Sequence, residues 1–344
     1  MSEDRAPDAL KLFSSSPKAS LYRWGNEGGY ERWIASTRQT RSICNDPQVA
    51  GIRYTDQLRE ACAEILRISG LPLKETSSVI INILRGGLNF GLRNALNDAF
   101  GWTKHTTCFI SAQRARDNAD SEEWHITENA YRKVYFPPEV SLIIGDVVAT
   151  GTSLRYALEE LLRAAKEARS SIRDIIFFTF GGRNADLILR EIDAGCREIF
   201  PNYNRTVLIY LEGCFEVPDT TAPLTIRLTG TDLVRRDAIM APEFSESQYE
   251  DPAFPLERCV IYDAGSRLLG PRIRRRRPRL LGAGAPPRRT RHLLPQLPRR
   301  AFPRTRREPL RRRLPQGTRP PPDRTHQTTL ILNEKKRDHY VGTL

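Results

Sequence analysis

The sequence predicts an α/β fold built on a mostly parallel sheet that is flanked by helices. Two observations support this class. Short apolar segments typical of buried strands recur between residues 78 and 211, and stretches with a helical spacing of apolar residues separate them. Because a strand that alternates with a helix needs a crossover connection, neighbouring strands are expected to run parallel.

The strands are expected where the chain is continuously apolar, as in sheets that are covered on both faces. The segment SVIINIL is one such run, and Arg85-Gly86-Gly87 closes it. The predicted strands cover residues 78–84, 106–111, 141–144, 174–180 and 206–211.

The helices are expected where apolar residues recur at i, i+3, i+4 and i+7 and so share one face. Such stripes run through LREACAEILRI, which Gly70-Leu71-Pro72 ends, and begin again at Leu92 and at Leu154. A last helix is predicted over 185–192. Residues 112–137 are polar and irregular, and they predict a long hairpin or flap.

Charge and composition divide the chain into three parts. The net charge is +13, yet residues 271–344 hold 22 Lys and Arg against 4 Asp and Glu, which leaves the rest of the chain mildly acidic. We expect a flexible N-terminal segment over residues 1–30 and one domain over residues 31–270. The tail 271–344 has almost no aromatic residues and is expected to be disordered.

Three interpretations of this basic tail are open. It is a basic arm for RNA, DNA or an acidic membrane, an inert solvated segment, or the product of a reading-frame shift in a GC-rich gene. The abrupt change of composition at Gly270 favours the frame shift. Nucleic acid is therefore expected as a partner only if the tail is genuine.

The cysteine and histidine patterns argue against a metal finger or a disulfide scaffold. The six cysteines are scattered without a Cys-x-x-Cys motif, and the five histidines form no cluster, so no residue is assigned as a metal ligand. This pattern fits a reducing cytosol. The N-terminus MSEDRAPDAL lacks a signal-peptide core, and no apolar run is long enough to span a membrane. We therefore expect a cytoplasmic protein.

The turn after the predicted strand 141–144 carries the clearest chemistry. Asp146 stands near the carboxyl end of that strand, where ligands gather in open α/β sheets. The small residues that follow it offer backbone N–H groups at a helix start, and they suit a phosphate, although an ordinary helix N-cap would use the same residue types. These residues are Ala149, Thr150, Gly151, Thr152 and Ser153. The turn is neither a Walker loop nor a dinucleotide fingerprint.

Three segments resemble, in order, the motifs of type I phosphoribosyltransferases, and among these the uracil phosphoribosyltransferases most. ILRGGL at 83–88 resembles the family's pyrophosphate loop I-L-R-A-G-L. VATGTS at 148–153 resembles its phosphate loop L-A-T-G-G-S. DAGSRLLG at 263–270 resembles its base-binding segment D-A-G-D-R-x-F-G. The resemblance covers about residues 30–270 and is weak between the motifs.

The resemblance implies the type I phosphoribosyltransferase fold with a small hood region. It also implies the reaction of uracil with phosphoribosyl pyrophosphate (PRPP), which gives UMP and pyrophosphate. It also implies Mg²⁺ bound with the PRPP, and a homo-oligomer. The transition state would be oxocarbenium-like, so catalysis would come from positioning and charge stabilisation rather than from a covalent nucleophile.

Residue roles follow from the same resemblance. Asp146 would hold the ribose hydroxyls, and residues 149–153 would hold the 5′-phosphate. Arg85, together with the backbone at Gly86, would face the pyrophosphate. Asp146 and Arg85 would thus be the catalytic residues.

The resemblance assigns further roles in the predicted flap and near the end of the domain. A flap arginine would reach the pyrophosphate, and Arg116 is preferred to Arg114 because Arg-Asp resembles the family's pair. The backbone of Tyr262, Asp263 and Ala264 would read the edge of the base, with Asp263 near the ribose or the pyrophosphate.

The chain departs from the family at the strand end and at the base-binding segment. Uracil enzymes keep the first of two adjacent acids, whereas here Gly145 comes first and the acid stands second. Ser266 replaces an acid of the base-binding motif, and the Pro-Gly before that motif is absent. Two other functions therefore stay open, namely a PRPP- or nucleotide-sensing regulator with the same fold, and a transferase for another base.

Overall fold

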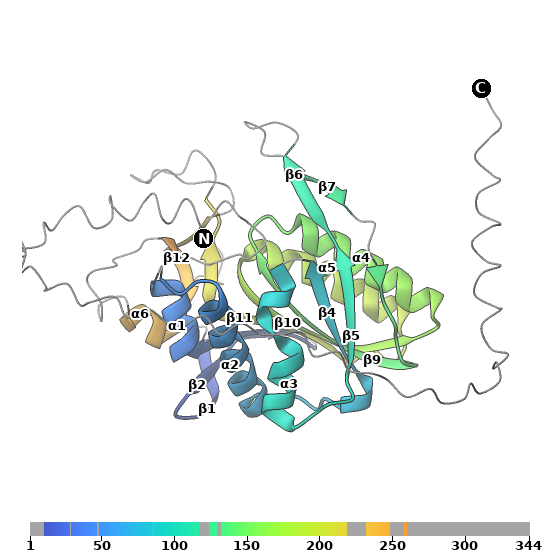
Figure 1. The fold of residues 1–344 in the computed structure, drawn as a ribbon, viewed down its shortest axis with the longest axis horizontal. Helices are drawn as coiled ribbons and strands as arrows, with labels where there is room; N and C mark the ends of the chain where they lie inside the picture. Colours follow the sequence, from blue (N-terminus) through green and yellow to red (C-terminus); the bar gives the residue numbers. More distant parts are fainter. Residues whose placement is uncertain are drawn as a thin grey trace, which may run out of the picture. The chain divides into compact units, whose positions relative to one another are not determined.

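The strands form one large sheet whose centre is parallel (Figure 1). This computed structural model describes residues 10–27, 29–46, 48–84, 86–116, 124–128, 132–218, 232–247 and 258–259. The strands of the sheet are β1 (Leu10–Ser15), β2 (Ala19–Glu27), β3 (Tyr30–Thr37), β4 (Ser78–Leu84), β5 (Thr106–Ser111), β8 (Arg132–Lys133), β9 (Glu139–Val148), β10 (Ser171–Gly182), β11 (Arg205–Glu216), β12 (Leu233–Met240) and β13 (Arg258–Cys259).

The order of the strands is β1-β2-β3-β11-β10-β9-β4-β5-β8, and β12 and β13 continue from β11. The six strands from β3 to β5 in this order all run parallel to their neighbours. In this sheet, antiparallel pairs join β1 to β2, β2 to β3 and β8 to β5 at the two ends of this order, and β12 to β11 and to β13 beside it. The predicted α/β class with a mostly parallel sheet is therefore confirmed.

Helices cover both faces of this sheet. Figure 1 shows α1, α2 and α3 grouped on one face, and α4 and α5 grouped on the other. Their bounds are α1 (Arg38–Asn45), α2 (Ile52–Ile68), α3 (Leu92–Phe100), α4 (Thr152–Glu167), α5 (Arg183–Ile199) and α6 (Pro242–Ser247), with short 3₁₀ helices η3 (Glu75–Ser77) and η4 (Gly86–Phe90). In the described part of the chain, no helix is both long and apolar enough to cross a membrane.

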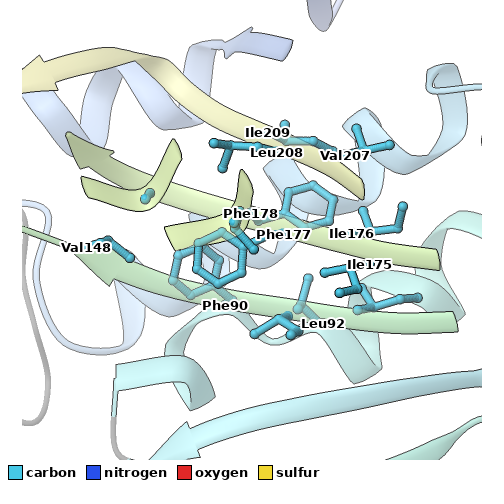
Figure 2. Packing of buried hydrophobic residues seen from close by; sticks show 14 of the residues in the cluster. Phe90, Leu92, Val148, Ile175, Ile176, Phe177, Phe178, Val207, Leu208 and Ile209 are labelled. Atoms are coloured by element: carbon cyan, nitrogen blue, oxygen red, sulfur yellow. The ribbon is translucent and has the colours of Figure 1, made fainter. Parts of the chain in front are cut away.

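The apolar core follows the central strands. Residues 175–178 of β10 and 207–211 of β11 are fully buried, because helices cover both faces of these strands. Figure 2 shows part of this core, which Phe90 and Leu92 share with residues of β9, β10 and β11. Each fully buried side chain of this size contributes about 1.5–3 kcal/mol. The candidate site therefore lies at the ends of strands that are packed into the core.

The N-terminal segment differs from its prediction. Residues 1–30 were expected to be flexible, but residues 10–27 form strands β1 and β2, which pair antiparallel with each other and with β3. Leu21 and Trp24 are buried in the main core. Gly25 and Gly29 lie at irregular points of this region, where they take φ values of 67° and 95° that favour glycine.

The predicted hairpin is present among the described residues of 112–137. There β6 (Gln113–Arg116) and β7 (Trp124–Glu128) pair antiparallel as a separate two-stranded sheet. It begins directly after β5, so this hairpin rises from the carboxyl end of a central strand, at the same edge as the candidate site.

Candidate functional site

The order of the sheet reverses between β4 and β9. Along the chain β4 is followed by β5 on one side of it, whereas β9 is followed by β10 and β11 on the other. In open α/β sheets, ligands bind outside the carboxyl ends of the strands at such a reversal. The turns after Leu84 and after Val148 flank this point, because β4 and β9 are parallel neighbours. Two of the motifs from the sequence therefore meet there.

Position 145 is closed to any side chain by the segment after β4. A Cβ built on Gly145 would lie 2.5 Å from Cγ of Phe90, which is fully buried. Likewise, a Cβ on Gly87 would lie 3.0 Å from the carbonyl oxygen of Gly145. Packing thus requires the glycine that stands where the family has its acid, and Asp146 is the acid at the carboxyl end of β9.

Asp146 lies on the other face of β9 from Gly145, because successive side chains of a strand alternate. Its register partner on β10 is Thr179, so these two side chains share a face. Asp146 is partly exposed, whereas Thr179 is fully buried. The Oγ1 of Thr179 has no hydrogen-bond partner among the described residues. A buried hydroxyl without a hydrogen-bond partner lowers the stability of a fold and is rare in native proteins. Such a hydroxyl therefore lies beside Asp146.

The turn after β9 has the geometry of an anion site. Gly151 adopts the left-handed region with φ 82° and is the N-cap of α4, and no side chain caps this helix. The helix starts with a bond from the Arg155 N–H to the Gly151 carbonyl, at 2.9 Å. The N–H groups of the first turn precede this bond and have no partner within the helix. Together with the helix dipole they can bind a phosphate.

The three hydroxyls of the turn are not equivalent. The Oγ1 atoms of Thr150 and Thr152 lie 3.5 Å apart at the N-terminus of α4. The Ser153 hydroxyl instead donates to the carbonyl of Ala112, at 2.9 Å, just before the β6–β7 hairpin. Ser153 can therefore offer an anion its backbone N–H, while its hydroxyl joins α4 to the base of the hairpin.

The first turn of α5 supports the phosphate turn from one side. The Asn184 Nδ2 donates to the Ala149 carbonyl at 2.8 Å. A Cβ on Gly151 would overlap the Cδ1 of Ile188, so α5 also lies against that glycine. The turn is therefore held by a hydrogen bond and by close packing, both from α5.

Sequence reasoning missed Asn184, Phe90 and Thr179. Asn184 left a weak signal, since it stands two residues after the Gly-Gly pair that follows a predicted strand, and just before the helix predicted over 185–192. Phe90 and Thr179 left none, because their roles arise from contacts between segments that are far apart in the chain.

Several predicted site residues cannot be placed. Arg85 lies outside the described residues, and Gly86 begins η4. Arg114 and Arg116 belong to β6, but their side chains are not described. The base-binding residues at 262–264 and the whole tail also lie outside the described residues. Their roles remain predictions.

A second acid near this edge of the sheet has a different environment. Glu212 of β11 is fully buried and accepts hydrogen bonds from the Ser36 hydroxyl at 2.8 Å, from the Thr37 N–H at 3.1 Å and from the Thr40 hydroxyl. Burial raises the pKa of Glu212 from 4.5 to about 7, although these hydrogen bonds act in the opposite direction. Thr37 is the N-cap of α1, so the Glu212 carboxyl accepts a hydrogen bond from the backbone at the N-terminus of that helix.

The residues of the site suit a metal that arrives with its substrate. Within the described ranges, no group of three or more His, Cys, Asp or Glu side chains could hold a metal ion. Mg²⁺ commonly binds through one or two carboxylates together with substrate phosphates. Asp146, a partly exposed carboxylate at the strand end, fits that role.

No family model and no curated protein matches the chain. Among solved structures, a hypoxanthine phosphoribosyltransferase from Staphylococcus aureus matches with a TM-score of 0.23 and 15% identity, over 41% of this chain and 63% of that one. The match thus spans less than two thirds of that protein.

Two further matches are similar in quality. A hypoxanthine-guanine phosphoribosyltransferase from Bacillus anthracis has a TM-score of 0.25 and 18% identity, over 37% of this chain and 69% of that one. A hypoxanthine phosphoribosyltransferase from Trypanosoma cruzi has a TM-score of 0.23 and 13% identity, over 60% and 93%. We draw no conclusion about family or activity from scores of this size.

Proposed function

We propose that this chain is a type I phosphoribosyltransferase that transfers ribose 5-phosphate from PRPP to a pyrimidine base, with uracil as the preferred base. One observation carries the proposal. The two loops that resemble the family's pyrophosphate and phosphate motifs follow adjacent parallel strands, β4 and β9, at the point where the sheet order reverses.

The residues of the two loops have distinct roles in this proposal. The backbone N–H groups of residues 150–153 bind the 5′-phosphate at the start of α4, where the N–H groups of the first helical turn have no partner within the helix. Asp146 accepts hydrogen bonds from the ribose hydroxyls. Arg85 and the backbone at Gly86, which follow β4, bind the pyrophosphate.

The reaction forms one bond and breaks one. A ring nitrogen of the base forms a bond to C1′ as the bond from C1′ to the pyrophosphate oxygen breaks, and that electron pair leaves with pyrophosphate. The proton of the ring nitrogen passes to solvent. No covalent nucleophile is needed, since positioning the two reactants and stabilising the leaving group supply the rate enhancement.

Mg²⁺ would be held by Asp146 and by the oxygens of PRPP, and when bound it neutralises charge that develops on the leaving pyrophosphate. Arg116, Tyr262, Asp263 and Ala264 complete the proposed site around the pyrophosphate and the base. A homo-oligomer and a cytosolic location belong to the same proposal.

A second candidate is a PRPP- or nucleotide-sensing protein with this fold. The observation that favours it is the contact between Gly145 and Phe90, which removes the acid that the family keeps at the first position. Such a protein would bind PRPP through the α4 turn without releasing pyrophosphate.

The proposal is tested by following pyrophosphate release by the full chain with Mg²⁺ and PRPP. Uracil, other pyrimidines and purines are offered one at a time. We expect release with uracil and a loss of at least about a hundredfold in Asp146→Asn. Asp56→Asn, at an exposed position of α2, is the matched control and should keep full activity.

Each other outcome has a defined meaning. Release with a purine alone would keep the mechanism and overturn the pyrimidine preference. PRPP binding without release for any base would favour the sensor. Neither binding nor release would contradict both functions.

A further inference from the structure

A side chain of α5 sets the orientation of one peptide in the phosphate turn. Asn184, the second residue of α5, donates its Nδ2 hydrogen to the Ala149 carbonyl at 2.8 Å. An asparagine near a helix start commonly accepts a bond from its own backbone. Here its amide reaches 35 residues back along the chain instead. The bond therefore serves the turn after β9.

The direction of that carbonyl determines the direction of a donor. The carbonyl of Ala149 and the N–H of Thr150 belong to one planar trans peptide and so point in opposite directions. Since the carbonyl points to α5, the Thr150 N–H points away from α5. It is the first backbone donor of the segment ahead of α4, whose N-cap is the next residue, Gly151.

A second contact from α5 fixes the same side of the turn. Ile188 lies one helical turn after Asn184 and packs so closely on Gly151 that a Cβ there would overlap its Cδ1. The left-handed conformation of Gly151 then leads the chain into α4. One side of the turn is thus occupied by α5, and the opposite side carries the Thr150 N–H.

We propose that Asn184 is a positioning residue for the anion site, which presets the Thr150 N–H to donate to the 5′-phosphate of PRPP. This inference rests on the proposed function of the same site. A donor that is already oriented loses little freedom when the ligand binds, so its effect appears in affinity. Without Asn184 the peptide can rotate and turn its carbonyl oxygen towards the phosphate.

The test is the binding of Mg²⁺-PRPP and of ribose 5-phosphate to the full chain, measured by titration calorimetry. Asn184→Ala removes the donor. Asn184→Asp keeps the shape but places a carboxylate against the Ala149 carbonyl. Asn97→Ala is the matched control, because the Asn97 Nδ2 also donates to a backbone carbonyl, that of Trp102 at 3.0 Å, beyond the end of α3.

We expect each Asn184 variant to bind both ligands on the order of tenfold more weakly than the wild type, while the melting temperature stays close to that of Asn97→Ala. In Asn184→Asp, the loss relative to the wild type should shrink as the pH falls, since a protonated carboxyl donates again. In turnover, KM for PRPP should rise more than kcat falls.

Wild-type binding with an unchanged affinity in the Asn184 variants would overturn this inference and leave the proposed function intact. Failure of both Asn184 variants to fold would also overturn it, because the residue would then act on stability. Absence of binding to the wild type would overturn the inference together with the proposed function.

Discussion

Two helices, α1 and α4, begin near the same edge of the sheet, and their N-termini are treated differently. At α1 the Thr37 side chain accepts from the Thr40 N–H, and the Thr37 N–H is shared between the Thr40 hydroxyl and the buried carboxyl of Glu212. At α4 the N-cap is Gly151 and no side chain caps the helix. The protein places a buried carboxyl of its own at the start of α1, whereas the proposed function assigns the start of α4 to the phosphate of a ligand.

The missing cap does not by itself distinguish α4. Helices α3 and α5 also begin at glycines without a side-chain cap. What sets α4 apart is its position after β9, beside the reversal of the sheet, and the support of its turn by Asn184 and Ile188. Under the proposed function, the comparison with α1 therefore separates a structural helix end from one that binds phosphate.

The largest effect on stability is expected at α1. Glu212→Ala removes the buried acceptor of three donors, namely the Ser36 hydroxyl, the Thr37 N–H and the Thr40 hydroxyl. The free energy of unfolding should therefore fall by about 4 kcal/mol at pH 6. Urea unfolding measures this cost, and PRPP affinity should not change. Glu198→Ala, at an exposed position, is the control. A loss of PRPP affinity in Glu212→Ala would remove the distinction between the two helix ends.

The same carboxyl should make stability depend on pH. The pKa of Glu212 is about 7 in the folded chain, where the carboxyl is buried, against 4.5 in the unfolded chain, where it is exposed to water. The folded state therefore binds this proton more tightly than the unfolded state. The free energy of unfolding should therefore fall as the pH rises from about 4.5 to about 7, by up to about 3 kcal/mol. Glu212→Gln should lack this fall when both proteins are unfolded in urea at pH 5 and pH 8. Equal slopes would show that Glu212 is not the group responsible.

At α4 the expected change concerns both stability and binding. Gly151→Ala meets the left-handed backbone cost and the overlap with Ile188, whereas Gly101→Ala meets only the backbone cost, since no atom lies within 4 Å of its added Cβ. The first variant should be about 2 kcal/mol less stable than the second and should lose PRPP binding. Equal stabilities in thermal unfolding would mean that α5 does not hold the turn.

The smallest expected change is a gain. Thr179→Val removes a buried hydroxyl that has no partner among the described residues, and it should raise stability by about 1 kcal/mol. Thr206→Val is the control, because the Thr206 hydroxyl bonds to that of Tyr203 and its loss should destabilise. A stability loss of the same size in both variants would indicate that Thr179 has a partner.

The parallel centre of the fold could be predicted from the sequence, because its strands are apolar on both faces. The predicted strands 78–84 and 106–111 coincide with β4 and β5. Strands β1 to β3 could not be predicted, since their sequence looks polar. Arg32 is only 4% exposed because its guanidinium lies over Trp24, at 4.2 Å from the ring centroid, and pairs with Asp186 at 3.5 Å. A pattern of hydropathy counts such an arginine as a surface residue.

The candidate site was predictable where one short segment carries it. Asp146 and residues 149–153 stand in a single strand–turn–helix unit, and the structure contains this strand and this helix as β9 and α4. The requirement for Gly145 and the role of Asn184 were not predictable. Both depend on contacts with Phe90 and Ala149 that exist only after β4, β9 and α5 have come together.

The binding of Mg²⁺-PRPP to the full chain, measured by titration calorimetry, tests the central claim most directly. Three proteins are compared: the wild type, Asp146→Asn beside the α4 turn, and Thr37→Val at the N-cap of α1. The account predicts that the wild type and Thr37→Val bind with the same affinity, and that Asp146→Asn binds at least about tenfold more weakly. No binding to the wild type, or an equal loss in both variants, would contradict it.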